Sequence, residues 1–164
     1  MYIMNLMKRM TMLIALLMLG VSVYAESPTG VNKAMNELVK KYDGAKGVNC
    51  VTVTKGQGLE VMKLMLNGEL GKSFMKGVTS ITVIDYSAAP AEVCDALRKD
   101  INVFTSLLQE FDVSQSKDLS KSKYTRCFAC TSAANEGRLS DFVLAIEEGE
   151  TRSIMYMAGE ICVK

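Results

Sequence analysis

Two cysteines three positions apart, Cys127 and Cys130 in the stretch RCFACT, have the residue types and spacing that best suit chemistry. A pair with this spacing acts as a redox dithiol where a helix N-terminus lowers the thiol pKa and the helical turn brings the two sulfurs together. The same spacing also supplies half of a zinc site when a second pair lies elsewhere in the chain. Three interpretations are therefore open: a dithiol, a pair of metal ligands, and two thiols that act separately.

The residues around this pair favour two separate thiols. Side chains alternate along 124–131 in the manner of a strand, and residues three apart in a strand point to opposite faces. The other cysteines stand singly, so the second pair that a zinc ribbon requires is missing. Five cysteines in an exported chain allow at most two disulfides and one free thiol, and the sequence leaves the pairing open. We regard Cys50, Cys127, Cys130 and Cys162 as candidates for disulfide or redox chemistry, and Cys94 as an apolar filler of a helix.

The remaining motifs point away from catalysis. The chain contains no histidine, which excludes Ser-His-Asp and Cys-His nucleophile pairs and histidine-bound zinc. The stretch GELGKS resembles the end of a phosphate loop, but Leu66 stands where that loop needs glycine; in GQGLEV, Val61 replaces the third glycine of a dinucleotide fingerprint. The methionines at 62, 65, 155 and 157 fall on predicted core elements rather than on an exposed copper site. We therefore predict a protein without cofactor, metal or enzymatic activity, with a thiol-disulfide redox role for Cys127 and Cys130 as the alternative.

The first 25 residues have the pattern of a secretory signal peptide. Lys8 and Arg9 precede an apolar run of thirteen residues over 11–23, which is shorter than the roughly 20 residues that span a bilayer as a helix. Small residues before and at Ala25 predict cleavage after that position. No cysteine follows the apolar run, so the pattern does not predict a lipoprotein. We expect an exported protein with no transmembrane segment after cleavage.

The predicted mature chain, 26–164, suits a single domain. Removing 25 of the 164 residues leaves 139, enough to bury about two-thirds of the unfolded surface. The signal segment holds two of the 19 basic residues and none of the 18 acidic residues, which leaves 17 basic and 18 acidic residues and a net charge of −1. A near-neutral chain without a basic patch is not expected to bind nucleic acid or anionic lipid. We expect a monomer.

Apolar periodicity and turn residues predict eight elements in the mature chain. They are helices over 31–44, 59–76 and 90–111, and strands over 47–55, 78–87, 124–131, 139–147 and 151–162. Gly68 and Gly71 weaken the second helix, so two shorter helices over 59–76 are the alternative. The order α-β-α-β-α-β-β-β begins with a βαβ unit and closes with an antiparallel meander. We therefore predict an α+β fold: a mixed, mostly antiparallel sheet of about five strands with the helices packed on one face.

This order of segments resembles a family of small exported bacterial proteins catalogued as domain of unknown function 4252. The resemblance covers about 31–161 and rests on the signal peptide, the segments VNCVTVTKGQGLEVMKLM and VTSITVIDYS, the long helix around LRKDINVFTSLLQEF, and a meander ending in SIMYMAGEI. It implies a non-catalytic protein in the periplasm or at the cell surface of a Gram-negative bacterium. Such a protein would bind an envelope protein or a small ligand in an accessory or signalling role, for example in a sigma-factor stress circuit. The family has no established active site, so the resemblance implies no functional residues.

Overall fold

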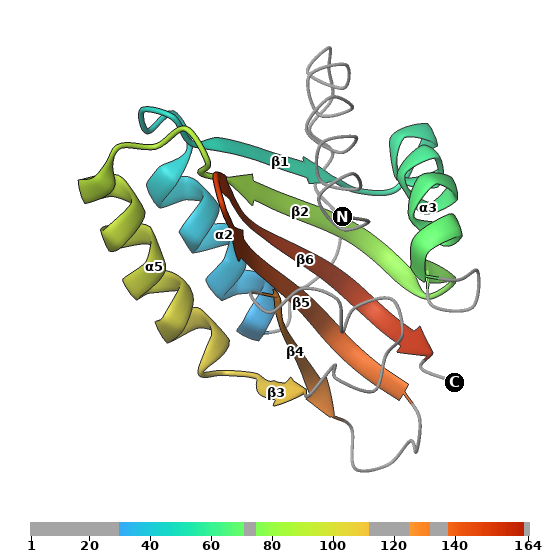
Figure 1. Ribbon diagram of the computed structural model, residues 1–164. Coiled ribbons are helices and arrows are strands. Elements are labelled where there is room, and N and C mark those ends of the chain that lie inside the picture. The colour runs from blue at the N-terminus through green and yellow to red at the C-terminus, as the bar shows by residue number, and fades with distance from the viewer. Residues whose placement is uncertain (1–29, 71–74, 112–124, 132–137, 163–164) are drawn as a thin grey trace.

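The computed structural model describes residues 30–70, 75–111, 125–131 and 138–162 (Figure 1). The predicted signal peptide, 1–25, lies outside the described residues. So do the polar loop over 112–123 and the turn AANEG at 133–137.

A six-stranded sheet forms the centre of the fold. Its strands are β1 (Asn49–Val53), β2 (Val78–Asp85), β3 (Gln109–Phe111), β4 (Thr125–Thr131), β5 (Arg138–Glu148) and β6 (Thr151–Cys162). They lie side by side in the order β1-β2-β6-β5-β4-β3, and every neighbouring pair is antiparallel. The predicted α+β fold with a mostly antiparallel sheet is confirmed, with one strand more than predicted.

The predicted βαβ unit is wrong, because β1 and β2 are antiparallel neighbours with Val51 opposite Val83. Helix α3 (Gln57–Leu70) joins them. A parallel crossover would carry the chain back along the whole length of the sheet. Instead, Val53 at the end of β1 lies opposite Ile81 near the start of β2, so α3 connects strand ends on the same side. The described strands therefore form an antiparallel sheet rather than a mixed one.

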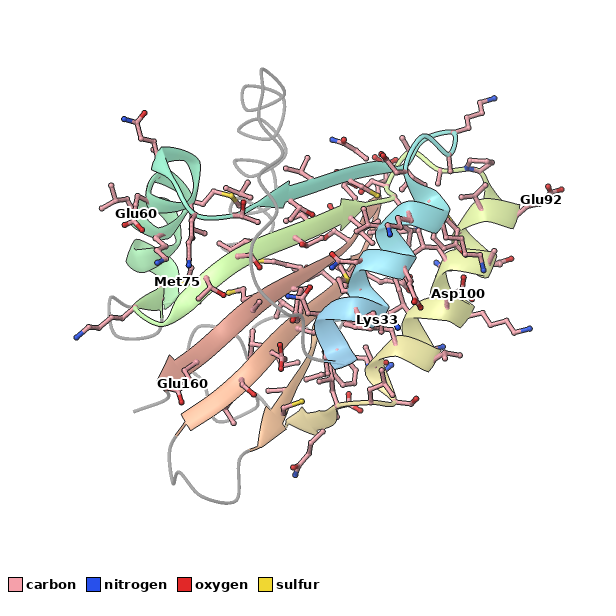
Figure 2. All side chains as sticks on the ribbon, turned by 180° about the vertical axis from the view of Figure 1, so that it is seen from behind. Lys33, Glu60, Met75, Glu92, Asp100 and Glu160 are labelled. Atoms are coloured by element: carbon pink, nitrogen blue, oxygen red, sulfur yellow. The ribbon has the colours of Figure 1, made fainter. Side chains whose placement is uncertain are left out.

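Two helices cover one face of the sheet. Helices α2 (Gly30–Tyr42) and α5 (Ala91–Thr105) lie next to each other there (Figure 1). Apolar residues at helical spacing form the buried stripe of each helix; the stripes consist of Val31, Met35, Leu38 and Tyr42 in α2, and Cys94, Leu97, Ile101 and Phe104 in α5. Asp100 on α5, which is labelled in Figure 2, joins the helices by accepting hydrogen bonds from Lys41 Nζ at 2.5 Å and Tyr42 Oη at 2.7 Å.

Helix α3 packs against the opposite face. Its buried residues Leu59 and Met62 belong to a second core that includes Ile81 and Val83 of β2. The predicted packing of the helices on one face therefore holds for α2 and α5 but not for α3. We call the two sides the α2/α5 face and the α3 face. Since side chains alternate along each strand, β2, β5 and β6 contribute buried residues to both cores.

Helix α5, the last of the three predicted helices, is shorter than its apolar stripe predicts. It ends at Thr105, where the chain makes a tight turn in which the Leu108 amide donates to the Thr105 carbonyl oxygen at 3.0 Å. The following residues form β3, whose Phe111 lies opposite Cys127 of β4. Leu108 still packs on the α2/α5 core, although it lies beyond the end of the helix. An apolar residue beyond a helix end can thus continue the spacing of the stripe without continuing the helix.

Candidate functional site

The two cysteines of the CxxC segment lie in strand β4, as predicted, and project to opposite faces. Cys127 pairs with Leu144 and is fully buried on the α3 face. Cys130 is half-buried against the α2/α5 core. The four cysteines whose side chains the structure describes, Cys50, Cys94, Cys127 and Cys130, carry free thiols. A direct bridge within the CxxC segment would require β4 to twist out of the sheet.

The surroundings of Cys50, Cys127 and Cys130 raise the pKa of each thiol and so favour its protonated form. Burial, assisted by the negative charge of Glu110, raises the pKa of Cys127 to about 12. Burial and Asp141 raise the pKa of Cys130, while burial and Asp43 raise that of Cys50 to about 11. A dithiol reductant needs a lowered thiol pKa, because the thiolate is the nucleophile.

The sheet register separates Cys50 from Cys162. Cys50 lies opposite Ile84, which in turn lies opposite Ile154 of β6. Cys162 follows Ile154 by eight residues on the same strand, and this corresponds to about 26 Å at 3.3 Å per residue. A disulfide requires Cα atoms within about 7 Å, so these two cysteines do not bridge within one chain.

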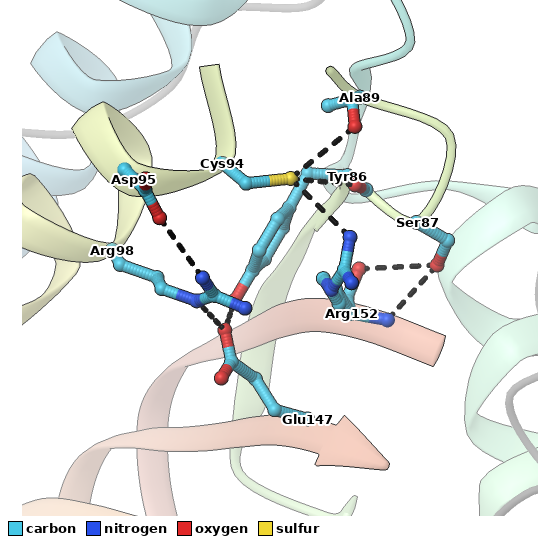
Figure 3. A network of polar contacts seen from close by, with 8 residues as sticks. All are labelled: Tyr86, Ser87, Ala89, Cys94, Asp95, Arg98, Glu147 and Arg152. Carbon is cyan, nitrogen blue, oxygen red and sulfur yellow. Dashed lines mark hydrogen bonds and ion pairs between the residues drawn. The ribbon is translucent and has the colours of Figure 1, made fainter. Parts of the chain in front are cut away.

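A network of interacting polar side chains lies where β2 ends, α5 begins and the β5–β6 hairpin turns (Figure 3). Glu147 of β5 is its centre. Its Oε1 accepts a hydrogen bond from Arg98 Nε at 2.6 Å and another from Tyr86 Oη at 2.8 Å. Arg98 also donates from Nη1 to Asp95 Oδ1 at 3.1 Å, one turn earlier on α5. A single carboxylate therefore connects the end of β2, helix α5 and the hairpin.

Arg152 forms the second half of this group. It faces Glu147 directly across the β5–β6 hairpin, and its Nη1 lies 3.5 Å from Cys94 Sγ (Figure 3). Its backbone N–H donates to Ser87 Oγ at 2.9 Å, and the Ser87 hydroxyl donates to the Arg152 carbonyl oxygen. The Cys94 thiol donates towards the carbonyl oxygens of Ala89 and Tyr86 at 3.4 and 3.7 Å. The loop between β2 and α5 is thus held to β6 by backbone, hydroxyl and thiol contacts.

Burial and hydrogen bonding shift the pKa values of Glu147 and Tyr86. Burial acts to raise the pKa of Glu147, but the hydrogen bonds from Arg98 and Tyr86 outweigh it and hold that pKa below its ordinary value. Burial and the hydrogen bond to Glu147 raise the pKa of Tyr86, which therefore stays protonated at neutral pH. Arg98, Glu147 and Cys94 each form hydrogen bonds to other members of this network. This arrangement joins the end of β2, helix α5 and the β5–β6 hairpin, and we call it the polar clamp.

A buried carboxylate lies at the far end of the same sheet face. Asp141 is 6% exposed and accepts a hydrogen bond from Tyr156 Oη at 2.5 Å. It has a φ of 54°, at the irregularity of the β5–β6 register between Ser140 and Phe142. Asp tolerates this left-handed conformation better than most residues. A β-bulge changes the direction in which a side chain points. Here it directs the Asp141 carboxyl group to a buried position beside Tyr156.

The other sequence motifs behave as packing. Met62, Met155 and Met157 are at most 3% exposed and belong to the α3-side core. The stretch GQGLEV spans the start of α3, and GELGKS lies partly outside the described residues. Among the described residues, no group of three His, Cys, Asp or Glu side chains is arranged to hold a metal ion.

Sequence reasoning did not single out the Glu147 group or Asp141. Glu147 and Arg152 lie on either side of the turn at 149–150 and carry opposite charges, which is the pattern of a cross-strand pair. Arg98 follows Cys94 by four residues and so shares its helix face. Asp141 lies within the mostly apolar run LSDFVLAI, where a carboxyl group is expected to need a hydrogen-bond partner.

Within the part of the chain that the structure describes, no helix has the length and apolar character needed to cross a membrane. Comparisons of the chain with protein-family models, with curated proteins and with solved structures found no match. The resemblance to the exported family of unknown function stays a prediction.

Proposed function

We propose that this chain is an exported binding or accessory protein of the bacterial cell envelope, without catalytic activity of its own. It acts by holding a partner protein or a small ligand. The observation that carries the proposal is the placement of the CxxC cysteines: Cys127 is fully buried, Cys130 projects to the other face, and burial raises the pKa of both. These features oppose the thiol-redox alternative, which was the one enzymatic hypothesis that the sequence raised.

The polar clamp supports the same proposal. Its charged groups bind one another across elements that are distant in sequence and so join the hairpin, the loop and the helix. Apolar side chains stand on the surface instead: Leu64 on α3 is 71% exposed, and Val103 on α5 is 65% exposed.

Export is tested by expressing the whole chain in a Gram-negative host and fractionating the cells. We expect the protein in the periplasmic or surface fraction, with an intact mass that corresponds to residues 26–164. Uncleaved protein in the cytoplasm would overturn the proposed location.

The absence of redox activity is tested by insulin-disulfide reduction with the purified protein and with its Cys127→Ser and Cys130→Ser variants. We expect all three to match the rate without protein. An activity that the native protein shows and either folded variant loses would overturn the proposal in favour of the thiol-redox function.

A further inference from the structure

We draw no further inference here: the strongest candidate, the surface patch that the exposed apolar side chains of Val61 and Leu64 form on helix α3, carries none because nothing in the structure shows what covers it.

Discussion

Glu147 shows how one side chain can join three elements. Its carboxylate accepts hydrogen bonds from Arg98 on α5 and from Tyr86 at the end of β2, and it lies opposite Arg152 across the hairpin. Because the side chains of Arg98 and Glu147 are 40% and 41% exposed, solvent screens their attraction. The hydrogen bonds set the direction of the hairpin relative to α5 more than they add to stability.

The acid dependence of stability should report on this carboxylate. The folded protein holds the pKa of Glu147 below its ordinary value of 4.5, so the ionised group stabilises the fold above that pH. The contribution is lost as the pH falls through the lower, folded-state pKa. We expect Glu147→Gln to make the free energy of unfolding less dependent on pH between about 3 and 5, measured by urea denaturation. Glu150→Gln, at an exposed site in the same hairpin, is the control; an identical effect of both substitutions would contradict the prediction.

Asp141 combines a buried charge with a left-handed backbone. We expect Asp141→Ala to lower the free energy of unfolding by about 2–3 kcal/mol, because it removes the acceptor of the Tyr156 hydroxyl and adds backbone strain. Asp141→Asn should cost clearly less, since asparagine keeps an acceptor and tolerates a positive φ. Chemical denaturation of the three proteins at one pH tests this. Equal losses for both variants would show that the charge itself, rather than acceptor and backbone geometry, stabilises the bulge.

At the scale of elements, the loop between α2 and β1 depends on a close backbone contact. Gly44 and Gly47 both have positive φ, at 81° and 74°, but only Gly47 faces the 88–89 backbone. Alanine at either site incurs the cost of the left-handed conformation, about 1–2 kcal/mol. At Gly47 the added Cβ atom would also displace the loop before α5.

We expect Gly47→Ala to lower the melting temperature more than Gly44→Ala, by roughly another 4–8 °C or more. Thermal unfolding followed by circular dichroism makes the comparison. Since φ is nearly the same at both sites, the difference isolates the steric contact. Equal decreases in melting temperature would mean that the loop between α2 and β1 and the loop before α5 can move apart at no cost in stability.

For the whole molecule, the two cores share one sheet, so they should unfold together. Cys94 lies in the α2/α5 core and Cys127 in the α3 core, and they are 2% and 0% exposed. Strands β2, β5 and β6 contribute to both cores, so neither can be exposed without disrupting the other.

Thiol labelling in increasing urea, read by peptide mass spectrometry, measures the protection of each cysteine. We expect Cys94 and Cys127 to give the same free energy of opening, and half-exposed Cys50 and Cys130 to label in the native state. Burial raises the pKa of Cys127 to about 12, which slows its labelling further because the thiolate reacts. Distinct opening energies for Cys94 and Cys127 would show two independent cores.

Much of this architecture is predictable from local patterns. The α2 stripe through Tyr42, the strand around Val83 and the C-terminal meander lie where period and turn residues predict them. These predictions succeed because each element buries one side, and burial imposes a local period of 3.6 or 2 residues on the sequence. The helical period gave a wrong prediction at Leu108 and Phe111. These residues lie in a turn and a short strand, although their spacing continues that of the helix.

The sequence by itself determined the class of the fold and the separation of Cys127 from Cys130, because both follow from local alternation along a strand. Only the tertiary structure decided that β1 and β2 are antiparallel, that α3 covers the other face, and that Glu147 meets Arg98 and Tyr86. Strand direction and these long-range contacts depend on where the chain turns back in space. The pattern of apolar residues along the chain does not indicate the direction in which the chain turns back, since the same helix can connect two parallel or two antiparallel strands.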